Sequence, residues 1–522
     1  MSGAIATPHE LATRAGYEAF AAGGNAIDAA LAAAATLTVV FPHQCALGGD
    51  LFALINLPDG KTFSVNGSGA LPAAVDVDEY RARFAEVPDS GPESITVPGL
   101  LRAWERMAKL GGSLGFAELL APAIRAAADG VRVSPSLAAG ILWRRETLLR
   151  DKGIADLFVP NGKPLIEGDL LKQPALQITL ETIAAMGVAS FYEGSVGEKL
   201  VSALRGLGSP LTMDDLAAHE TEINDPLSLE YGDLSLLTSP PNSQGFVLLE
   251  SIAGLAGLGI GLEASSNNAP YMLQASMLAA EDRDQYLGDP NNVSVPLATL
   301  LDESLLAERL SQRLGQKQSE HHKHYNTAAN GDTVAICAMD SDGMAVSLIQ
   351  SVYQTFGAGI LEAETGIIMH NRARGFSLTQ GAANELIPGT RPAHTLMPLL
   401  AYRDGKAIAS LGTMGGRAQA QILLQIVEGV LNVATSIATT LAAPRWVFGA
   451  RDMGFDRPTI AIEDDAVAEL GELLTTDGFE IARVEPQNEM MGHANVVRFD
   501  ADGNFEAAAD PRSDGLALVY EE

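Results

Sequence analysis

Residues 330–351 read NGDTVAICAMDSDGMAVSLIQS and carry the strongest β-strand signal in the chain. Two apolar runs, 333–339 and 344–353, flank the turn-forming residues 340–343, where a glycine supplies the positive φ of a tight hairpin. Both faces of the first run carry apolar side chains. Because such a strand is buried on both sides, the stretch predicts a hairpin inside a layered sandwich of sheets and helices.

The length and composition agree with a large folded enzyme. The chain has 522 residues, of which 47% are hydrophobic and 19% are charged, so it can bury a substantial core. Its net charge of −31 repels phosphate backbones and anionic lipid. We therefore expect that the protein binds neither nucleic acid nor a membrane surface.

The cysteines, the first residues and the apolar runs give no sign of a disulfide-rich, secreted or membrane-spanning protein. Cys45 and Cys337 are too few for a disulfide framework, and their apolar neighbours indicate small buried side chains. The opening residues lack the basic and long apolar regions of a signal peptide. The longest apolar run, 29–41, is shorter than the roughly 20 residues that span a bilayer. These features favour a cytoplasmic enzyme.

The segment 315–332 is polar, rich in turn formers and nearly free of large hydrophobic residues, which predicts an exposed linker. It contains His321, His322 and His324, but no carboxylate or cysteine is spaced with them as in a metal site. No P-loop, GxSxG or HExxH motif occurs. We expect no metal and no organic cofactor.

Thr333 follows this linker directly and has two interpretations. It can be a β-branched residue that merely opens a strand. Alternatively, cleavage of the Asp332–Thr333 bond would make Thr333 a new N-terminus. Its α-amine, with a reference pKa of about 7.7–8.0, could then act as the base for its own hydroxyl. Nucleophile and base would then share one residue at the end of a rigid strand.

A threonine nucleophile needs donors for the oxyanion, and GTMGG at 412–416 can provide them. The motif lies between a predicted strand and a helix expected to begin near Arg417. Adjacent glycines at a helix N-terminus expose backbone N–H groups with no side chain in the way. Strand–glycine–helix turns are also common as purely structural features, so the motif by itself allows both interpretations.

Ordered motifs along almost the whole chain resemble the γ-glutamyltransferase family of self-cleaving N-terminal nucleophile hydrolases. In chain order they are GGNAIDAALAAAATL (23–37), ALGGD (46–50), TVPGLLRAW (96–104), PPNSQG (240–245), EDRDQYLGDP (281–290), GDTVAICAMDSDGMAVSLIQS (331–351), FGAGI (356–360), TRPAHTLMP (390–398), GTMGG (412–416) and DPRSDG (510–515).

The resemblance implies a four-layer αββα sandwich. It also implies that Thr333 is the nucleophile after cleavage of the Asp332–Thr333 bond, and that Gly415 and Gly416 form the oxyanion hole. The large segment 1–332 and the small segment 333–522 would stay together as a heterodimer, whose further assembly the sequence leaves open.

The residues at the positions that bind a γ-glutamyl donor in the family differ from the family pattern. The arginine expected for its carboxylate falls near Val77, with Arg81 and Arg83 close but displaced, and Gly375 replaces the acidic residue that holds its amino group. The remaining positions give candidate substrate-binding residues that differ from the family's: Ser351 for threonine, Tyr353 for asparagine, and His394 and Thr395 for a serine pair.

Arg372 is a new group in this region. Its guanidinium could bind a substrate carboxylate bidentately, or it could form a structural ion pair. His394 could likewise orient substrate or be a packed, hydrogen-bonded side chain. This pattern is similar to a side branch of the family that includes oxamate amidohydrolase.

The sequence thus predicts a self-processing amidohydrolase that forms an acyl-enzyme on Thr333. The substrate is a γ-glutamyl-like compound such as glutathione or a small anionic amide such as oxamate. A non-catalytic relative that keeps the fold is the alternative from another class.

Overall fold

The hairpin around Thr333 forms the middle of a large antiparallel sheet. In the computed structural model, which describes residues 2–264, 267–315, 332–449, 459–474 and 479–522, β9 (Asp332–Asp340) pairs with β10 (Ala345–Tyr353). All residues of both strands except Asp332 are buried. The prediction of a hairpin enclosed between layers is confirmed.

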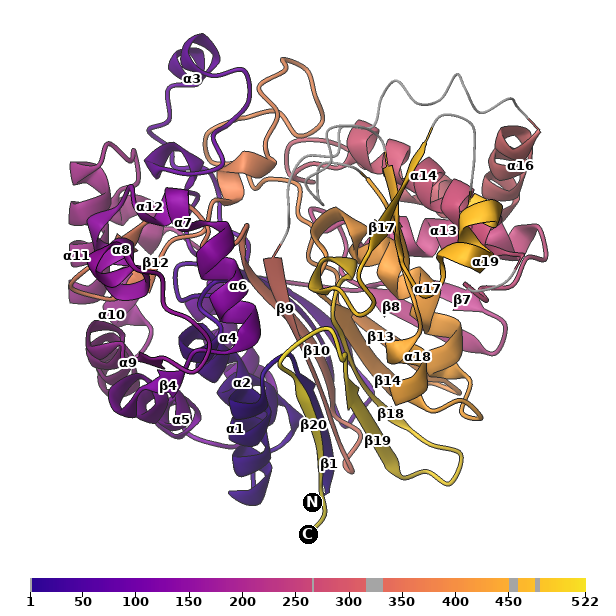
Figure 1. Cartoon of the computed structure of the whole chain (residues 1–522), viewed down its shortest axis with the longest axis horizontal. Helices are drawn as coiled ribbons and strands as arrows, with labels where there is room; N and C mark the ends of the chain where they lie inside the picture. Colours follow the sequence, from indigo (N-terminus) through magenta and orange to yellow (C-terminus); the bar gives the residue numbers. More distant parts are fainter. Residues whose placement is uncertain (1, 265–266, 316–331, 450–458, 475–478) are drawn as a thin grey trace.

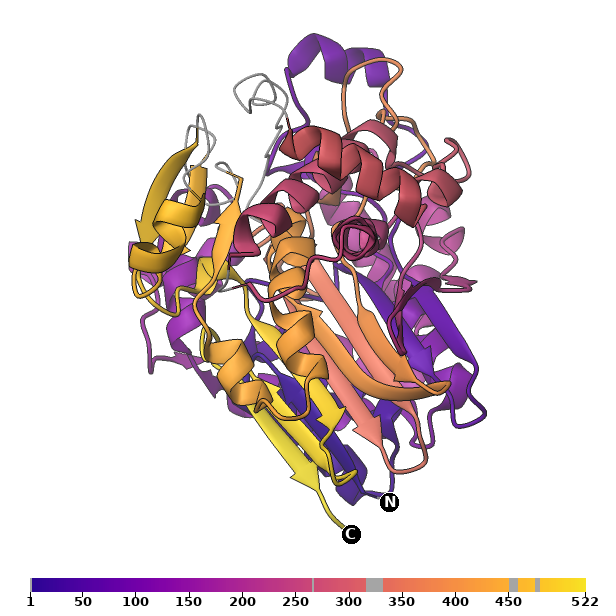
Figure 2. The same cartoon turned by 90° about the vertical axis from the view of Figure 1, so that its right-hand side faces the viewer.

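Two sheets lie face to face in the centre of the molecule (Figures 1 and 2). The first has the order β20 (Leu516–Tyr520), β1 (Gly3–Thr7), β9, β10, β2 (Asp50–Asn56), β3 (Thr62–Asn66) and β6 (Glu222–Asn224). The second has the order β19 (Phe505–Ala509), β18 (Ala494–Phe499), β14 (Lys406–Thr413), β13 (Leu399–Arg403), β8 (Leu234–Thr238) and β7 (Leu227–Tyr231).

Hydrogen bonds between side chains and backbone join the two sheets across their inner faces. Ser347 Oγ on β10 donates to the carbonyl of Leu411 on β14 at 2.6 Å. Ser410 Oγ on β14 donates back to the carbonyl of Val346 at 2.7 Å. Because these hydroxyls are satisfied, the polar groups do not disrupt the apolar packing between the sheets.

Helices cover the outer face of each sheet (Figure 1). The first sheet is covered by α1 (Glu10–Ala21), α2 (Ala26–Val40) and α4 (Leu100–Gly111), and α5 (Phe116–Asp129) packs on α2. The second is covered by α13 (Gly245–Gly257) and α17 (Gln419–Leu431), and α14 (Ala269–Tyr286) packs on α13. The helix α2 is buried along its whole length, as its nearly all-apolar sequence requires. The predicted αββα sandwich is confirmed.

Shorter elements surround this sandwich. The other helices are α3 (Val77–Arg83), α6 (Pro135–Trp143), α7 (Arg145–Leu148), α8 (Lys152–Phe158), α9 (Pro174–Met186), α10 (Ala189–Tyr192), α11 (Ser195–Gly206), α12 (Met213–Ala217), α15 (Leu297–Leu300), α16 (Glu303–Leu314), α18 (Ile437–Ala442) and α19 (Val467–Leu474). The small sheets consist of β15 (Trp446–Phe448), β16 (Thr459–Glu463) and β17 (Glu480–Val484), of β4 (Val131–Arg132) and β5 (Leu170–Leu171), and of β11 (Leu361–Glu362) and β12 (Ile367–Ile368).

Strands from both sides of the Asp332–Thr333 bond contribute to each sheet. In the first sheet, β1, β2, β3 and β6 precede the bond, whereas β10 and β20 follow it. The two ends of the chain lie together, because Gly3 on β1 pairs with Tyr520 on β20 (Figure 1). A break before Thr333 would therefore leave both fragments hydrogen-bonded within shared sheets. The division into 1–332 and 333–522 stays a prediction.

The linker prediction is wrong at its last residue, and most of the segment lies outside the described residues. Residues 316–331, with His321, His322 and His324, are not described. Asp332, assigned to the exposed linker, is instead the first residue of β9 and is partly buried. The register extends this far because Asp332 pairs with Tyr353 on β10.

Two further observations concern the chain as a whole. Cys45 and Cys337 are free and buried, as predicted. Among the described residues no single helix has the length and apolar composition needed to cross a membrane. The pair Pro174–Met186 and Ala189–Gly206, bent by 117°, reaches that threshold only when its two helices are counted together.

Candidate active site

Ser351 joins both residues of the predicted cleavage site. Thr333 is the second residue of β9 and is 1% exposed. Its Oγ1 donates to Ser351 Oγ at 3.3 Å. Ser351 Oγ in turn donates to the carbonyl oxygen of Asp332 at 2.6 Å and accepts the N–H of Tyr353 at 2.7 Å. The one hydroxyl proton of Ser351 is therefore directed at the carbonyl that precedes Thr333.

A β-bulge sets this geometry. The β9–β10 register shifts between Gln350 and Tyr353, and Tyr353 has a φ of 79°. A bulge leaves backbone groups of the longer strand outside the regular ladder and re-aims the side chains beside it. As a result, Ser351 bonds across to Asp332 by its side chain.

The Asp332 side chain is itself held in place. Its carboxylate accepts a hydrogen bond from Thr355 Oγ1. Burial raises the pKa of Asp332 to about 6, against the opposing effects of the Thr355 hydrogen bond and the Arg144 charge. The carboxyl group thus titrates close to neutral pH.

The glycine pair lies in the loop between β14 and α17. Gly415 and Gly416 have φ values of 140° and 54°, which favour glycine at both positions. A 3₁₀ turn, Gly416–Ala418, starts at the second glycine and leads into α17 at Gln419, which agrees with the predicted helix start near Arg417. Within the described chain neither glycine N–H donates a hydrogen bond to a protein acceptor. Both are therefore available to an oxyanion, as that prediction requires.

Gln244 fixes this loop to a second candidate residue. Its Nε2 donates to the carbonyls of Gly416 and Thr395, both at 2.9 Å. The motif PPNSQG therefore acts by bracing the glycine loop against the segment that carries His394 and Thr395. Sequence reasoning assigned no role to Gln244, because its partners lie more than 150 residues further along the chain.

Two cavities of about 350 Å³ each lie at this end of β9. The Arg374 cavity is lined by Ala85, Glu86, Gln244, Arg283, Asp284, Leu287, Tyr353, Arg374, Gly375, Phe376, Ser377, Leu378, Thr379, Ala382, Asn384, Ala393, His394, Thr395 and Arg417. The Glu489 cavity is lined by His43, Gln44, Ser136, Ala139, Gly140, Trp143, Asp332, Thr355, Met414, Gly415, Ala418, Val447, Asn488, Glu489 and Met490.

The end of β9 and the glycine loop separate these cavities. Tyr353 lines the Arg374 cavity, whereas its cross-strand partner Asp332 lines the Glu489 cavity. In the loop, Gly415 faces the Glu489 cavity and Arg417 faces the Arg374 cavity. Thr333 lines neither cavity, but the adjacent pair of Asp332 and Tyr353 contributes one residue to each.

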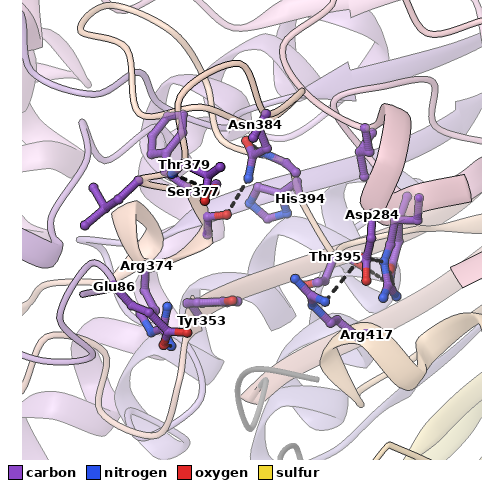
Figure 3. Close-up of a pocket in the computed structure, with 18 of the residues that line it drawn as sticks. Glu86, Asp284, Tyr353, Arg374, Ser377, Thr379, Asn384, His394, Thr395 and Arg417 are labelled. Carbon is purple, nitrogen blue, oxygen red and sulfur yellow. Dashed lines mark hydrogen bonds and ion pairs between the residues drawn. The ribbon is translucent and has the colours of Figure 1, made fainter. Parts of the chain in front are cut away.

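The Arg374 cavity contains several of the predicted substrate-binding residues. Tyr353, His394 and Thr395 line it together with Gly375. Figure 3 shows Tyr353 between the ion pair of Arg374 with Glu86 and the ion pair of Arg417 with Asp284. The buried Thr395 Oγ1 has no hydrogen-bond partner within the described chain, so it is free to bind a ligand.

Arg372 lies behind the wall of this cavity. The side chain is fully buried, and its Nε donates to Asp50 Oδ2 at 2.8 Å. Its guanidinium carbon is 4.1 Å from the ring centroid of Tyr353. Burial acts to raise the pKa of Asp50, but Arg372 and the neighbouring histidines hold it well below its usual range. The structure thus places Arg372 in the structural ion pair that was one of its two interpretations.

His394 is also a member of this buried cluster. Its Nε2 donates to Asp50 Oδ2 at 2.7 Å, and its Nδ1 accepts the N–H of Leu396 at 3.2 Å. Burial lowers the pKa of His394 to about 4, and Arg372 acts in the same direction while Asp50 opposes it. His394 is therefore neutral near pH 7, with both ring nitrogens engaged, and can offer a ligand only its ring surface.

No arginine replaces the family arginine near Val77. Val77 packs against an apolar cluster that includes Ala373 and Phe376. Arg81 pairs with Glu385 at 2.6 Å, and Arg83 pairs with exposed or partly exposed glutamates, so neither lines the cavity. Among the arginines that do line the cavity is Arg374, which sequence reasoning missed. The sequence RARG does not distinguish Arg372 from Arg374 as the residue that faces the cavity. Only the 3₁₀ turn Arg372–Gly375 decides between them.

A family model described as Gamma-glutamyltranspeptidase matches residues 12–520. The chain belongs to the gamma-glutamyltranspeptidase family. It is 35% identical over 518 residues to the Glutathione hydrolase-like YwrD proenzyme of Bacillus subtilis (strain 168), covering 98% of each chain. It is 31% identical over 528 residues to the Oxamate amidohydrolase proenzyme of Klebsiella pneumoniae, covering 99% of this chain and 98% of the relative.

A solved structure extends the likeness to the fold. The cephalosporin acylase from Bacillus halodurans matches with a TM-score of 0.89 at 31% identity, covering 100% of this chain and 96% of the acylase. The whole sandwich, and not one half of it, is therefore shared with an acylase. Membership supports an enzyme of the hydrolase and acyltransferase class with the N-terminal nucleophile hydrolase fold.

Proposed function

We propose that this chain is a self-processing amidohydrolase in which Thr333 becomes an N-terminal nucleophile. The observation that carries the proposal is the position of Ser351 Oγ, 2.6 Å from the Asp332 carbonyl oxygen and 3.3 Å from Thr333 Oγ1. A strand residue with a purely structural role needs no hydroxyl donor aimed at the preceding carbonyl. The names of both relatives as proenzymes agree with a processed chain.

Self-processing would proceed in two balanced steps. The Thr333 hydroxyl attacks the Asp332 carbonyl carbon, and Ser351 stabilises the negative charge that develops on its oxygen. The C–N bond breaks, the hydroxyl proton passes to the Thr333 nitrogen, and an ester joins Asp332 to Thr333 Oγ1. Water then hydrolyses the ester, which leaves a carboxylate on Asp332 and a free α-amine on Thr333. The fragments 1–332 and 333–522 remain together as a heterodimer.

Turnover repeats this chemistry on an external amide. The α-amine of Thr333 accepts the hydroxyl proton as the oxygen attacks the substrate carbonyl. The Gly415 and Gly416 N–H groups stabilise the oxyanion. The amine product leaves with the proton, and water releases the acid from the acyl-enzyme.

The Arg374 cavity favours a small anionic acyl group. Arg374 makes a single ion pair with Glu86, whose side chain is 48% exposed, so several guanidinium donors remain for a substrate carboxylate. Gly375 provides no acidic side chain at the position where the family pattern has one for a donor's α-amine, and His394 is neutral. An oxamate-like amide, the substrate named for the Klebsiella relative, satisfies these conditions.

A γ-glutamyl compound is the second candidate. Glu86 lines the same cavity and pairs with Arg374. Its carboxylate could hold the α-amino group of such a donor while Arg374 holds the α-carboxylate. The name of the Bacillus subtilis relative, a glutathione hydrolase-like protein, is compatible with this assignment.

One preparation can test these points. Denaturing mass spectrometry should show two fragments that meet between Asp332 and Thr333, and the cut protein should hydrolyse oxamate faster than glutathione. A preference for glutathione would select the second candidate. A chain that stays intact after prolonged incubation and turns over neither amide would identify a non-catalytic relative.

A further inference from the structure

The Glu489 cavity has an unusual combination of an apolar wall and a carboxylate. Trp143, Met414 and Val447 supply large apolar surfaces, and no arginine or lysine lines it within the described chain. Glu489 is the one carboxylate that the segment after Thr333 contributes. An apolar wall with one negative group suits a ligand that is apolar in bulk and carries a cationic or hydrogen-donating end.

Glu489 is held by donors from the other segment. Its Oε1 accepts Ser136 Oγ at 2.5 Å and Gln44 Nε2 at 2.8 Å. Ser136 Oγ lies 3.1 Å from His43 Nε2, which fixes the serine in turn. Oε2 has no hydrogen-bond partner within the described chain, and the side chain keeps 30% of its surface exposed. One oxygen therefore orients the carboxylate, and the other is left for a ligand.

The position of the cavity relative to Thr333 indicates which part of a substrate it receives. If the acyl group binds in the Arg374 cavity, as proposed above, its carbonyl must lie at the Gly415–Gly416 loop for the glycine N–H groups to bind the oxyanion. This loop contributes Arg417 to the Arg374 cavity and Gly415 to the Glu489 cavity. The two substituents of an amide carbonyl point in different directions, so the nitrogen substituent of that substrate extends into the Glu489 cavity.

We propose that the Glu489 cavity is the subsite for the leaving amine and takes an aromatic or branched aliphatic amine that carries no carboxylate. This inference rests on the proposed function. The Glu489 carboxylate attracts the amine end, the apolar walls bury its hydrocarbon part, and a carboxylate on the amine would be repelled.

In the uncut chain Asp332 forms part of the cavity wall, and its carboxylate accepts a hydrogen bond from Thr355. Burial raises the pKa of Glu489 to about 7 against the hydrogen bond from Ser136, and the charge of Asp332 raises it further. Cleavage adds a second carboxylate to Asp332 and so increases the repulsion. The departure of Asp332 then widens the subsite on the side of Thr333.

The test compares phenethylamine with phenylalanine, which is the same amine with an added carboxylate. Calorimetric titration of the cut enzyme should show phenethylamine binding at least tenfold more tightly than phenylalanine. Glu489→Gln, which keeps the shape, should weaken phenethylamine binding at least tenfold. Trp143→Ala should weaken it too, whereas Glu181→Gln, an exposed carboxylate on α9, should not change it.

Uncut Thr333→Ala protein should bind the amine more weakly than the cut enzyme, because Asp332 stays in the cavity wall and narrows it. Equal binding of both ligands, or unchanged phenethylamine binding in Glu489→Gln, would overturn the subsite. Mass spectrometry and an oxamate hydrolysis assay on the same preparation distinguish failure of the subsite proposal from failure of the proposed function. A cut, active enzyme that ignores the amine contradicts only this inference, whereas an uncut wild type contradicts both proposals.

Discussion

The two cavities beside Thr333 differ in how their charges are neutralised. In the Arg374 cavity each charged side chain has an opposite partner, as in Arg374 with Glu86 and Arg417 with Asp284. In the Glu489 cavity the carboxylates of Asp332 and Glu489 face the same space, and burial keeps His43 neutral by lowering its pKa. Paired charges select a ligand mainly by the direction of their hydrogen bonds, whereas unpaired carboxylates select it by the sign of its charge. The two ends of one substrate can thus be selected by different interactions.

The largest expected effect removes the nucleophile that both cavities share. Thr333→Ala should abolish self-cleavage and turnover together, because neither step has a hydroxyl to form the ester. Thr333→Ser keeps a hydroxyl and should still be cut. Mass spectrometry and an oxamate assay give both readouts, and an alanine variant that is cut and active would refute the shared nucleophile.

The next largest effect should come from Gly415, in the glycine loop between the two cavities. Gly415→Ala should lower kcat by about 10²–10³-fold, the usual loss when one oxyanion donor is misplaced. The added Cβ would lie 2.6 Å from Ile422 Cδ1 at a φ of 140°, so the loop must shift. Gly405→Ala introduces a side chain at a φ of 74° with open space around it and serves as the control. Equal losses of kcat in the two variants would point to backbone strain alone.

Within the Arg374 cavity, two neighbouring arginines should separate binding from stability. Arg374→Met should raise KM for oxamate about 10- to 100-fold, the usual range for a hydrogen bond to a charged group, with little change in kcat. Arg372→Met leaves the buried Asp50 carboxylate without its main partner and should cost about 3–5 kcal/mol of unfolding free energy. Urea denaturation and steady-state kinetics measure the two effects. A raised KM in a fully stable Arg372→Met protein would restore Arg372 as a substrate ligand.

Local patterns in the sequence were enough to predict the central hairpin and its burial, whereas the four-layer sandwich was predicted from the resemblance to the family. The hairpin around 340–343 follows from a glycine turn between two apolar runs, and the burial of α2 follows from a helix that is apolar on every side. These signals are short-range, because neighbouring residues determine them. The motifs around Thr333 and the glycine pair are contiguous too, but by themselves they left a structural interpretation open. Their catalytic roles came from the resemblance to the family and stay predictions.

The walls of the cavities could not be predicted in this way. Glu489 is held by Ser136 and Gln44, which lie 353 and 445 residues away in the chain. No periodicity links such residues, and only the packing of the two segments brings them together. Arg372 and Arg374 show the same limit at short range, since a 3₁₀ turn rather than residue type decides which one is buried.

The smallest effect tests the like-charged character of the Glu489 cavity through pH. The pKa of Glu489 is raised from an ordinary value of 4.5 to about 7 in the fold, with burial as the main cause. Below pH 4.5 the carboxyl is neutral in both the folded and unfolded states. Above pH 7 it is ionised in both states, and only the folded state must accommodate a partly buried charge. Wild-type stability therefore falls as the pH rises through this window.

Glu489→Gln cannot ionise, so its advantage should appear only on the alkaline side. In the uncut Thr333→Ala background, where Asp332 still shares the cavity, its Tm should equal the parent's near pH 4.5. Near pH 8 its Tm should exceed the parent's by on the order of 1–2 °C. Thermal denaturation at the two pH values measures the difference, with Glu181→Gln as the exposed control. A difference that does not vary with pH would mean that Glu489 is solvated like a surface carboxylate, and the contrast between the two cavities would then lose its electrostatic basis.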